Sequence, residues 1–274
     1  MAPWYARSQV LITGASSGIG AALARALAPD VAGLVLVARR AAALEALAAE
    51  LARPGLEITV LPCDLGDGPA VDVLLAALAA RPQPVDVLVN NAGLGQAGFF
   101  EQSDPAQLQQ MLAVNVVALT RLTRALLPGM VQRRRGGVLF VSSGFGLTWM
   151  PLYAAYVGTK HFVTAFAEAL RAEVAGTGVV ITQLNPGPVD TGFEAVAGNP
   201  LGQPVPAAFS LGAEACARAG LRAFAARRAM VVPHPLVGPF IRLGAATPRV
   251  VLRLVYAWTA RRFRARLAAP GVAA

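Results

Sequence analysis

The chain has 274 residues and a mass of 28.3 kDa, enough to bury the core of one domain, and its 55% hydrophobic and 14% charged residues exclude disorder over most of its length. Two cysteines and two histidines are too few for a disulfide framework or an ordinary Cys/His zinc cluster, and we predict no metal site. The net charge of +9 is uneven, because eleven arginines and no acidic residue fall in residues 216–274, while residues 1–215 carry 13 basic and 15 acidic groups, or −2.

Short apolar runs bounded by turn residues alternate along the chain with longer alanine- and leucine-rich stretches. The apolar runs predict seven strands, at residues 8–13, 33–38, 57–62, 85–89, 137–142, 178–184 and 229–232. The longer stretches predict helices near residues 18–28, 40–52, 68–80, 105–130, 154–175 and 212–227. Continuous apolar strands alternating with helices indicate an α/β fold of Rossmann type: a doubly wound parallel sheet, covered on both faces by helices, in a single domain.

The sequence indicates neither a targeting signal at its start nor a membrane-spanning segment. The first residues, MAPWYARSQVLITG, contain no basic stretch followed by a long apolar run, so we predict no signal peptide and a cytoplasmic location. The longest uncharged segment, residues 136–159, holds five glycines and Pro151, which predicts a buried strand and a loop.

A glycine-rich turn, TGASSGIG at residues 13–20, follows the first predicted strand and runs into a helix. Glycines at this spacing allow a tight turn and a close approach of the backbone to a pyrophosphate, while the free N–H groups of the helix start bind the anion. An ordinary strand-to-helix turn is the alternative for this motif taken alone. We expect a dinucleotide to contact Gly14, Ser16, Ser17, Gly18, Ile19 and Gly20.

The second predicted strand ends in Arg39 and Arg40, about twenty residues after the glycines, where an NAD site would place an acidic residue. A guanidinium can bind a ribose 2′-phosphate through two hydrogen bonds, so this pair favours NADP(H) over NAD(H). A solvated arginine pair is the alternative. Asp64, after the third strand, could accept a hydrogen bond from the adenine amino group or cap a helix, and Leu65 beside it joins the predicted cofactor site.

Further motifs follow in chain order: Asn90-Asn91-Ala92-Gly93, Asn115, Ser143, Tyr156-Val157-Gly158-Thr159-Lys160, and Pro186-Gly187 with Thr191. Together with the glycine turn they make residues 8–195 closely resemble the short-chain dehydrogenase/reductase family. Each motif alone is common, but the ordered combination is specific. The resemblance implies an NAD(P)-dependent oxidoreductase that interconverts a carbonyl and an alcohol.

The chemistry of carbonyl reduction explains the residue types. Hydride transfer leaves an oxyanion that must receive a proton, and a tyrosine with a pKa of about 10 is a reluctant donor. Tyr156 and Lys160 lie four residues apart on a predicted helix, so the ammonium can lower the pKa of the phenol and also bond the nicotinamide ribose. Ser143 would then hydrogen-bond the substrate carbonyl. The resemblance implies that Asn115 supports a water relay to Lys160.

Lys160 is also singled out by composition, because it is the only lysine in a chain with 23 arginines. A guanidinium is permanently charged and cannot act as a compact titrating ammonium, which gives chemistry a reason for the exception. The alternative is that this one lysine has no function and is present by chance. Tyr153 has no lysine at the fourth following position, so we expect it to be a pocket wall or a core residue.

The resemblance completes the cofactor site after the fourth and sixth strands. It implies that the backbone of Ala92 and Gly93, next to Asn91, lies near the cofactor and that Thr191 holds the nicotinamide carboxamide. Pro186, Gly187 and Val189 join the same site.

We expect the substrate loop and helix at about residues 186–228, with a hydrophobic small molecule as substrate. Aromatic and apolar residues near the presumed carbonyl site predict an apolar pocket, although they could equally be core. These residues are Phe145, Leu147, Trp149, Met150, Tyr153, Phe193 and Phe209.

We divide the chain into a catalytic domain at residues 1–232 and a basic extension at 233–274, in which Pro233, Pro235, Pro239 and Pro248 break the chain before a possible helix at 249–267. That helix has Arg249, Arg253 and Arg264 on one side and Val251, Val255 and Trp258 on the other, although Arg262 falls near the apolar side and spoils the pattern. Our hypothesis is peripheral contact with an anionic membrane. Packing on the body or on a sister subunit is the alternative. The tail matches no nucleic-acid-binding module, and His234 has no assigned partner.

The sequence therefore predicts an NADP(H)-dependent oxidoreductase with Tyr156 as proton donor, Lys160 as its activator, Ser143 as carbonyl anchor and Asn115 as relay support. A non-catalytic nucleotide-binding regulatory or scaffold protein of the same fold is the alternative, and such a protein would need neither Tyr156 nor the solitary lysine. The resemblance further implies a homo-oligomer paired through the helices at 105–130 and 154–175.

Overall fold

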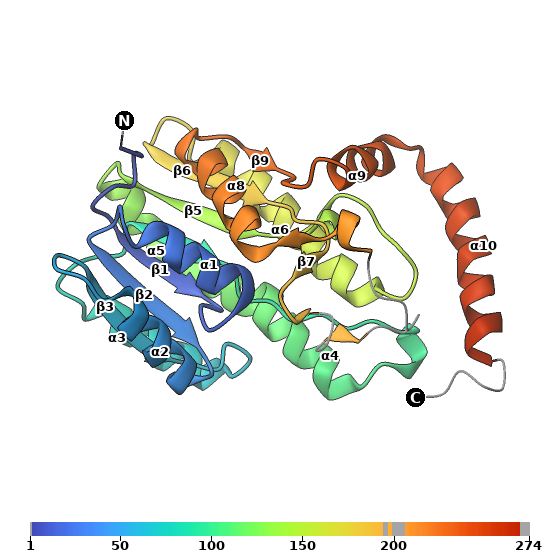
Figure 1. Ribbon diagram of the computed structural model, residues 1–274, viewed down its shortest axis with the longest axis horizontal. Coiled ribbons are helices and arrows are strands. Elements are labelled where there is room, and N and C mark those ends of the chain that lie inside the picture. The colour runs from blue at the N-terminus through green and yellow to red at the C-terminus, as the bar shows by residue number, and fades with distance from the viewer. Residues whose placement is uncertain (1, 194–196, 199–205, 269–274) are drawn as a thin grey trace.

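The computed structural model describes residues 2–193, 197–198 and 206–268. At its centre lies a seven-stranded parallel sheet in the order β3-β2-β1-β4-β5-β6-β9 (Figure 1). All seven predicted strands are confirmed, and the Rossmann-type single domain with them. The strands are β1 (Gln9–Thr13), β2 (Gly33–Ala38), β3 (Glu57–Pro62), β4 (Val87–Asn90), β5 (Gly136–Val141), β6 (Val179–Leu184) and β9 (Met230–Val231).

Helices cover both faces of the sheet because alternate residues of each strand enter opposite cores. Val10 and Ile12 of β1 belong to one core, whereas Leu11 between them belongs to the other. The first core is closed by α1 (Gly18–Leu27), α2 (Ala41–Leu51) and α8 (Ala213–Ala225). The second is closed by α3 (Gly68–Ala79), α5 (Leu119–Gln132) and α6 (Ala154–Glu173).

The predicted helix at 105–130 is a composite of three segments. A π-helical segment, η2 (Ala113–Ala118), separates α4 (Pro105–Leu112) from α5, and π segments of this kind often occur at functional sites. Among the described residues, Pro105–Gln132 is the one helix long and apolar enough to cross a bilayer by length and composition. Its Leu122 and Met130 are fully buried in the second core, as in the core helix of a globular domain.

The segment expected to form the substrate loop and helix, at about residues 186–228, holds a small second sheet in which β7 (Val189–Asp190) pairs with β8 (Leu211–Gly212). Short 3-10 turns occur at η1 (Phe100–Gln102), η3 (Gly144–Gly146) and η4 (Ala207–Phe209).

Two helices end the described chain, α9 (Val237–Ala246) and α10 (Arg249–Ala268). The predicted helix at 249–267 is confirmed as α10. The sequence analysis did not predict α9, which lies among the prolines expected to break the chain and holds Pro239 in its first turn. An N–H group in a first turn has no partner inside the helix, so a proline there removes no helical hydrogen bond.

The strand order reverses between β1 and β4, since the chain moves outward from β1 to β3 and then returns to the other side of β1. In parallel α/β sheets a crevice opens at the carboxyl ends of the strands where the order reverses. Thr13 ends β1 and Asn90 ends β4, so both strands deliver their following loops to this crevice.

Candidate active site

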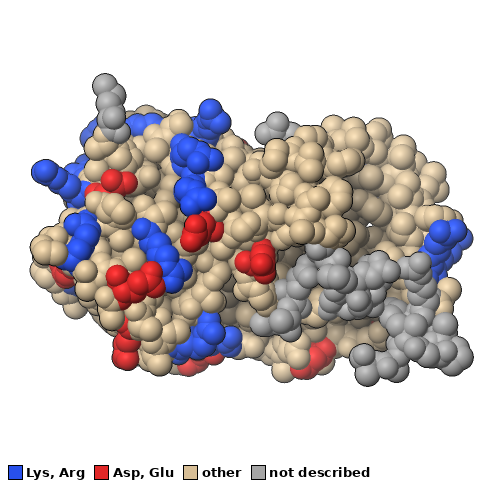
Figure 2. Space-filling view, viewed as in Figure 1, with Lys and Arg blue, Asp and Glu red and all other residues tan. Residues whose placement is uncertain are grey.

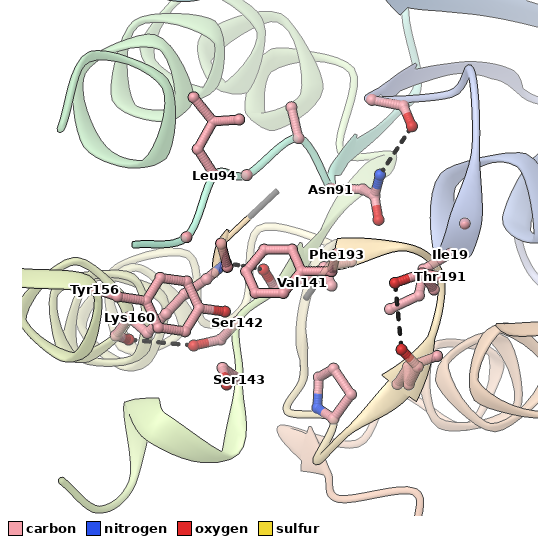
Figure 3. A pocket seen from close by; sticks show the side chains of 18 of the residues that line it. Ile19, Asn91, Leu94, Val141, Ser142, Ser143, Tyr156, Lys160, Thr191 and Phe193 are labelled. Carbon is pink, nitrogen blue, oxygen red and sulfur yellow. Dashed lines mark hydrogen bonds between the residues drawn. The ribbon is translucent and has the colours of Figure 1, made fainter. Parts of the chain in front are cut away.

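A cavity of about 840 Å³ lies at the carboxyl ends of the strands. Its volume is within the range of sites that bury small molecules. Of the cofactor-binding and catalytic residues predicted from the sequence, all but Gly20 and Asn115 line it. In Figure 3, Ser143, Tyr156 and Lys160 lie on one side of this space and Ile19 and Thr191 on the other, with Phe193 between them.

The glycine turn has the backbone that its sequence requires. Gly14 and Gly18 adopt φ values of +66° and +55°, which residues with a Cβ rarely adopt. Gly20 does not line the cavity, but a Cβ atom there would lie 2.2 Å from the Gly14 carbonyl oxygen. These glycines therefore let α1 begin directly behind the turn with its first N–H groups facing the cavity.

Asn91 fixes the glycine turn to the end of β4. Its Nδ2 donates to the carbonyl oxygens of Thr13 at 2.9 Å and Gly14 at 3.3 Å. The Thr13 hydroxyl accepts from the backbone N–H groups of Asn91 and Ala92, each at 3.0 Å. The segment from Asn91 to Gly93 is thus held against the turn at the cavity wall.

Arg40 reaches back from the end of β2 to the glycine turn. Its guanidinium donates to the hydroxyls of Ser17 at 2.8 Å and Ser16 at 3.1 Å. Arg39 lies beside it, and both arginines are exposed at the cavity rim. One cation and two hydroxyls therefore converge at a point suited to a phosphate group.

Asp64 and Leu65 line the cavity after β3. The Asp64 carboxylate accepts a hydrogen bond from the backbone N–H of Gly66 at 2.9 Å, which fixes the local turn. The alternative role as a helix cap is wrong for Asp64, because the residue at the start of α3 is Asp67.

Ser143 follows β5 and is nearly buried. Its hydroxyl accepts from the backbone N–H of Phe145 at 3.2 Å, which places it at the start of η3. Asn185, after β6, donates to the Ser143 carbonyl oxygen at 3.2 Å. The sheet thereby fixes the backbone that carries this hydroxyl.

Tyr156 and Lys160 lie one turn apart on α6 and are 7% and 5% exposed. Lys160 Nζ lies 5.8 Å from the centre of the Tyr156 ring and donates to the carbonyl oxygen of Val141 at 3.0 Å. Burial raises the pKa of Tyr156 to about 12, although its hydrogen bond with Ser143 acts to lower that pKa. For Lys160, burial acts in the opposite direction and lowers the pKa to about 8.

The expectation that Lys160 lowers the Tyr156 pKa is therefore wrong for the protein without a bound ligand. Removal from water disfavours the charged form of both groups, and this desolvation dominates. The phenol stays protonated at neutral pH, ready to donate a proton.

Asn115 comes from the π-helical segment and is buried behind the cavity wall. Its side-chain amide donates to the carbonyl oxygen of Leu94 at 2.8 Å and to the Thr159 hydroxyl at 3.1 Å, and it accepts from the Leu94 N–H at 2.8 Å. A Cβ atom at Gly93 would lie 3.4 Å from Lys160 Nζ and 3.5 Å from Asn115 Oδ1. The two side chains therefore converge at Gly93.

The apolar part of the cavity differs in part from the sequence prediction. Phe145, Met150, Tyr153 and Phe193 line it, and the Phe193 ring lies 5.6 Å from that of Tyr156. Leu147, Trp149 and Phe209 do not line the cavity. Phe209 is 41% exposed, and Trp149 packs edge-on against Tyr256 of α10.

The wall residues that sequence reasoning missed include Val237 and Ile241 of α9. A Cβ atom at Gly187 would lie 2.8 Å from a methyl carbon of Val237, and one at Gly144 would lie 2.4 Å from a methyl carbon of Ile241. α9 thus packs directly on the backbone next to Ser143. Two apolar residues spaced four apart after a proline-rich stretch gave no signal of this role.

His234, left without a partner in the sequence analysis, caps α9. Its Nδ1 accepts from the backbone N–H groups of Leu236 and Val237, each at 3.1 Å, and the residue is buried. Both donors belong to the orphan N–H groups at a helix start. Within the described part of the chain, no group of three or more His, Cys, Asp or Glu residues is placed to hold a metal ion.

Comparison with known proteins gives a consistent family. A model of the short chain dehydrogenase family matches residues 8–200. Dehydrogenase/reductase SDR family member 7B of Bos taurus is 37% identical over 198 residues, which cover 70% of this chain and 61% of that protein. The chain thus spans less than two thirds of the length of this relative.

Solved structures resemble the whole chain more evenly. A short-chain dehydrogenase from Sphingobium yanoikuyae in complex with NADPH has a TM-score of 0.76 and 28% identity, with 97% of this chain and 98% of that chain covered. A short-chain dehydrogenase/reductase from Burkholderia phymatum in complex with NAD has a TM-score of 0.75 and 29% identity, with 87% and 93% covered.

Proposed function

The chain belongs to the short-chain dehydrogenase/reductase family, and we propose that it is an NADP(H)-dependent oxidoreductase that interconverts a carbonyl and an alcohol on a hydrophobic substrate. One observation carries this proposal: the cavity that receives the glycine turn is also lined by Ser143, Tyr156 and Lys160. A proton donor, a hydroxyl for the carbonyl oxygen and a buried cation therefore share one space with a dinucleotide-type turn.

The residues present fit a nicotinamide dinucleotide. The glycine turn and the start of α1 suit its pyrophosphate, and the segment from Asn91 to Gly93 would lie along it. Thr191, with Pro186, Gly187 and Val189, would flank its nicotinamide, and Asp64 with Leu65 its adenine. The bound cofactor supplies or accepts the hydride.

The preference for NADP(H) rests on Arg40, supported by Arg39. The Arg40 guanidinium already bridges the Ser16 and Ser17 hydroxyls, a set of donors that can surround a 2′-phosphate. No acidic residue competes at the end of β2. Relatives with NADPH and with NAD both occur in the family, so the argument depends on these side chains.

The proton comes from Tyr156 in the direction of reduction. Its hydroxyl gives the proton to the carbonyl oxygen as that oxygen becomes an alcohol, and Ser143 donates a hydrogen bond to the same oxygen. Lys160 stabilises the phenolate that remains. Asn115 acts as a positioning residue, because it hydrogen-bonds both the Leu94 backbone and Thr159 beside Lys160. The proposal also includes a water relay that Asn115 supports and that leads to Lys160.

The substrate class follows from the apolar wall. Phe145, Met150, Phe193, Val237 and Ile241 surround the space near Tyr156. Among the described residues, the charged side chains that line the cavity are those of Arg39, Arg40, Asp64 and Lys160. A bulky aliphatic or aromatic ketone or aldehyde would bury its apolar surface there. A carboxylate in the same place would lose its hydration without a partner.

The test supplies NADPH and a set of ketones to the purified chain and follows the loss of nicotinamide absorbance. Each apolar ketone is paired with an analogue of similar size that bears a carboxylate. We expect reduction of the apolar member and slow or no reduction of its partner. NADPH binding without turnover of any carbonyl or alcohol would favour the non-catalytic alternative.

The homo-oligomer, the cytoplasmic location and the division at residue 232 stay predictions. Leu112, Val117 and Phe162 are 44%, 52% and 38% exposed on the helices implied in subunit pairing, which supports an apolar interface there. Light scattering on the full chain and on a Val117→Asp variant tests it, since a charge in that interface should separate the subunits.

A further inference from the structure

Exposed apolar side chains gather on the last two helices. Of the fourteen large apolar side chains exposed among the described residues, eight lie between residues 236 and 258. We define the C-terminal apolar surface by six of them: Leu236, Phe240 and Leu243 at α9, and Val250, Leu254 and Trp258 on α10. Proteins rarely expose such a cluster without a binding partner for it.

On each of these two helices, one face packs against the rest of the protein and another face is exposed. The exposed side chains therefore lie on helices that are packed against the domain. α9 directs Val237 and Ile241 into the cavity, while Phe240 is 67% and Leu243 is 66% exposed. α10 buries Leu252, which is 8% exposed, while Leu254 is 71% and Trp258 is 54% exposed.

α10 is fixed to the body at both ends. Near its start, the Arg249 guanidinium lies 5.9 Å from the Trp149 ring centre. Near its end, Arg264 forms an ion pair with Glu101 at 2.6 Å and lies 4.0 Å from the Phe99 ring centre. These contacts fix the orientation of α10, so that Leu254 and Trp258 face away from the body.

Unneutralised arginines flank the surface. Residues 216–274 contain no acidic residue, and neither Arg253 nor Arg261 forms an ion pair with another described residue. Arg262 lies 3.9 Å from the Trp258 ring centre. On the face seen in Figure 2, charged side chains gather over the α1 and α2 half.

The charge pattern distinguishes the possible occupants. A second copy paired through the same surface would bring its arginines against these arginines, with no acidic residue of the segment to neutralise them. An anionic bilayer offers acyl chains to the apolar side chains and phosphates to the arginines. Arginines beside exposed leucine and tryptophan side chains suit such an interface, because their long stems let the guanidinium reach the phosphates.

We propose that the C-terminal apolar surface docks on an anionic lipid bilayer. Phe240, Leu254 and Trp258 enter the boundary between headgroups and acyl chains, and Arg253 and Arg261 contact lipid phosphates.

Docking also refines the substrate class, in a step that rests on the proposed function. α9 presents Phe240 to the bilayer and Ile241 to the cavity, so a single helix separates the lipid from the substrate site. A carbonyl compound dissolved in the membrane therefore has a short path to Tyr156.

The test is co-sedimentation of the full chain with vesicles of phosphatidylcholine alone and of an equimolar mixture with phosphatidylglycerol. We expect pelleting with the anionic vesicles and much less with phosphatidylcholine. A combined Phe240→Ser, Leu254→Ser, Trp258→Ser variant should stay in the supernatant. Leu254→Ser alone has a matched control in Val73→Ser, because Val73 is 72% exposed on α3; the first should weaken binding and the second should not.

The charges are tested separately. Each Arg253→Gln or Arg261→Gln substitution should weaken binding to anionic vesicles by about fivefold, whereas Arg218→Gln on α8 should not. Retained NADPH binding shows that each variant is folded. Equal binding to both kinds of vesicle, or unchanged binding by the triple variant, would overturn the proposal. Dissociation of an oligomer in the triple variant would also overturn the proposal, since the surface would then be a subunit interface.

Sedimentation needs no turnover, so its outcome is separate from that of the proposed activity. Tyr156→Phe should pellet like the unmodified chain. If a carbonyl is reduced, the triple variant should raise the KM for a ketone held in anionic vesicles and leave the KM for a water-soluble ketone unchanged. Equal effects on both ketones would contradict the path through the lipid.

Discussion

Lys160 Nζ lies 5.8 Å from the centre of the Tyr156 ring, and both side chains are removed from water. Burial shifts their pKa values in opposite directions, raising that of Tyr156 to about 12 and lowering that of Lys160 to about 8. Tyr156 thus keeps its proton, while Lys160 loses its charge in mildly alkaline solution.

This difference predicts opposite pH profiles for the two directions. The kcat/KM of carbonyl reduction should be level below about pH 8 and fall above it, as Lys160 loses the charge that stabilises the phenolate. Alcohol oxidation needs the phenolate as base, so its rate should rise with pH. Initial rates in both directions over one buffer series check this. A reduction rate that does not change across pH 8 would contradict the role of Lys160.

The lowered pKa of Lys160 also predicts how the free energy of unfolding depends on pH. Between about 8 and 10.5 the unfolded chain binds a proton at Lys160 that the folded chain does not, so the free energy of unfolding should rise with pH in that window. Lys160→Met should be more stable than the unmodified protein below pH 8 and should lack this rise. Denaturant titrations at several pH values measure it, and an identical slope in both proteins would contradict the burial of a titrating lysine.

Arg40 should decide the choice of cofactor. Loss of a charge-assisted contact to a phosphate costs about 1.5–3 kcal/mol, so Arg40→Ala should bind NADPH about tenfold to a hundredfold more weakly. NADH, which lacks the 2′-phosphate, should bind as before. Fluorescence titration of the nicotinamide measures both, with Arg218→Ala as control because Arg218 pairs with Glu214 at the surface of α8. Parallel losses for both cofactors would refute the phosphate role.

Gly20 offers a test of the turn with a matched control on another helix. A Cβ atom at Gly20 would lie 2.2 Å from a backbone oxygen, whereas one at Gly158 meets nothing within 4 Å. Gly20→Ala should lower the free energy of unfolding by about 1–3 kcal/mol and weaken cofactor binding, since the backbone must shift. Gly158→Ala should raise it by about 0.5–1 kcal/mol, because alanine favours the helix. Thermal unfolding with and without NADPH compares the pair, and a Gly20→Ala protein with normal cofactor affinity would rule out the tight turn.

His234 ties the stability of α9 to the substrate wall. His234→Ala removes the acceptor of two helix-start N–H groups, which should cost about 0.5–2 kcal/mol and raise the substrate KM by loosening Val237 and Ile241. His161→Ala is the control, because the His161 ring contacts only the Val157 carbonyl of its own helix among its described hydrogen bonds. Equal effects of the two substitutions would show that the cap is unimportant.

The sequence predicts the sheet well because each strand is a continuous apolar run, as strands covered on both faces must be. The glycine turn and the Tyr156–Lys160 spacing are also local patterns, so they can be read without the fold. α9 could not be, since its contacts with Gly144 and Gly187 join segments about fifty to a hundred residues apart in the chain. The two-residue strands β7 and β8 are too short for any periodic signal.

The electrostatics of the site also lay outside the sequence. Spacing places Lys160 near Tyr156 and so predicts a lower tyrosine pKa, but it does not show how far both side chains are removed from water. In the fold, desolvation outweighs proximity and the Tyr156 pKa rises. The partners of Arg40 and His234 likewise appear only when the loops are brought together.

The central claim is that Tyr156 donates the proton in an NADPH-dependent reduction. The most direct measurement compares kcat for an apolar ketone in the unmodified chain, in Tyr156→Phe and in Tyr5→Phe, with the NADPH affinity of each. Tyr5 is a buried tyrosine of the core, packed on Trp4 and Phe224 away from the cavity. The account predicts that Tyr156→Phe loses about 10²–10⁴ in kcat with NADPH affinity nearly unchanged, while Tyr5→Phe keeps its rate. A Tyr156→Phe protein that reduces the ketone at the rate of the unmodified chain would contradict it.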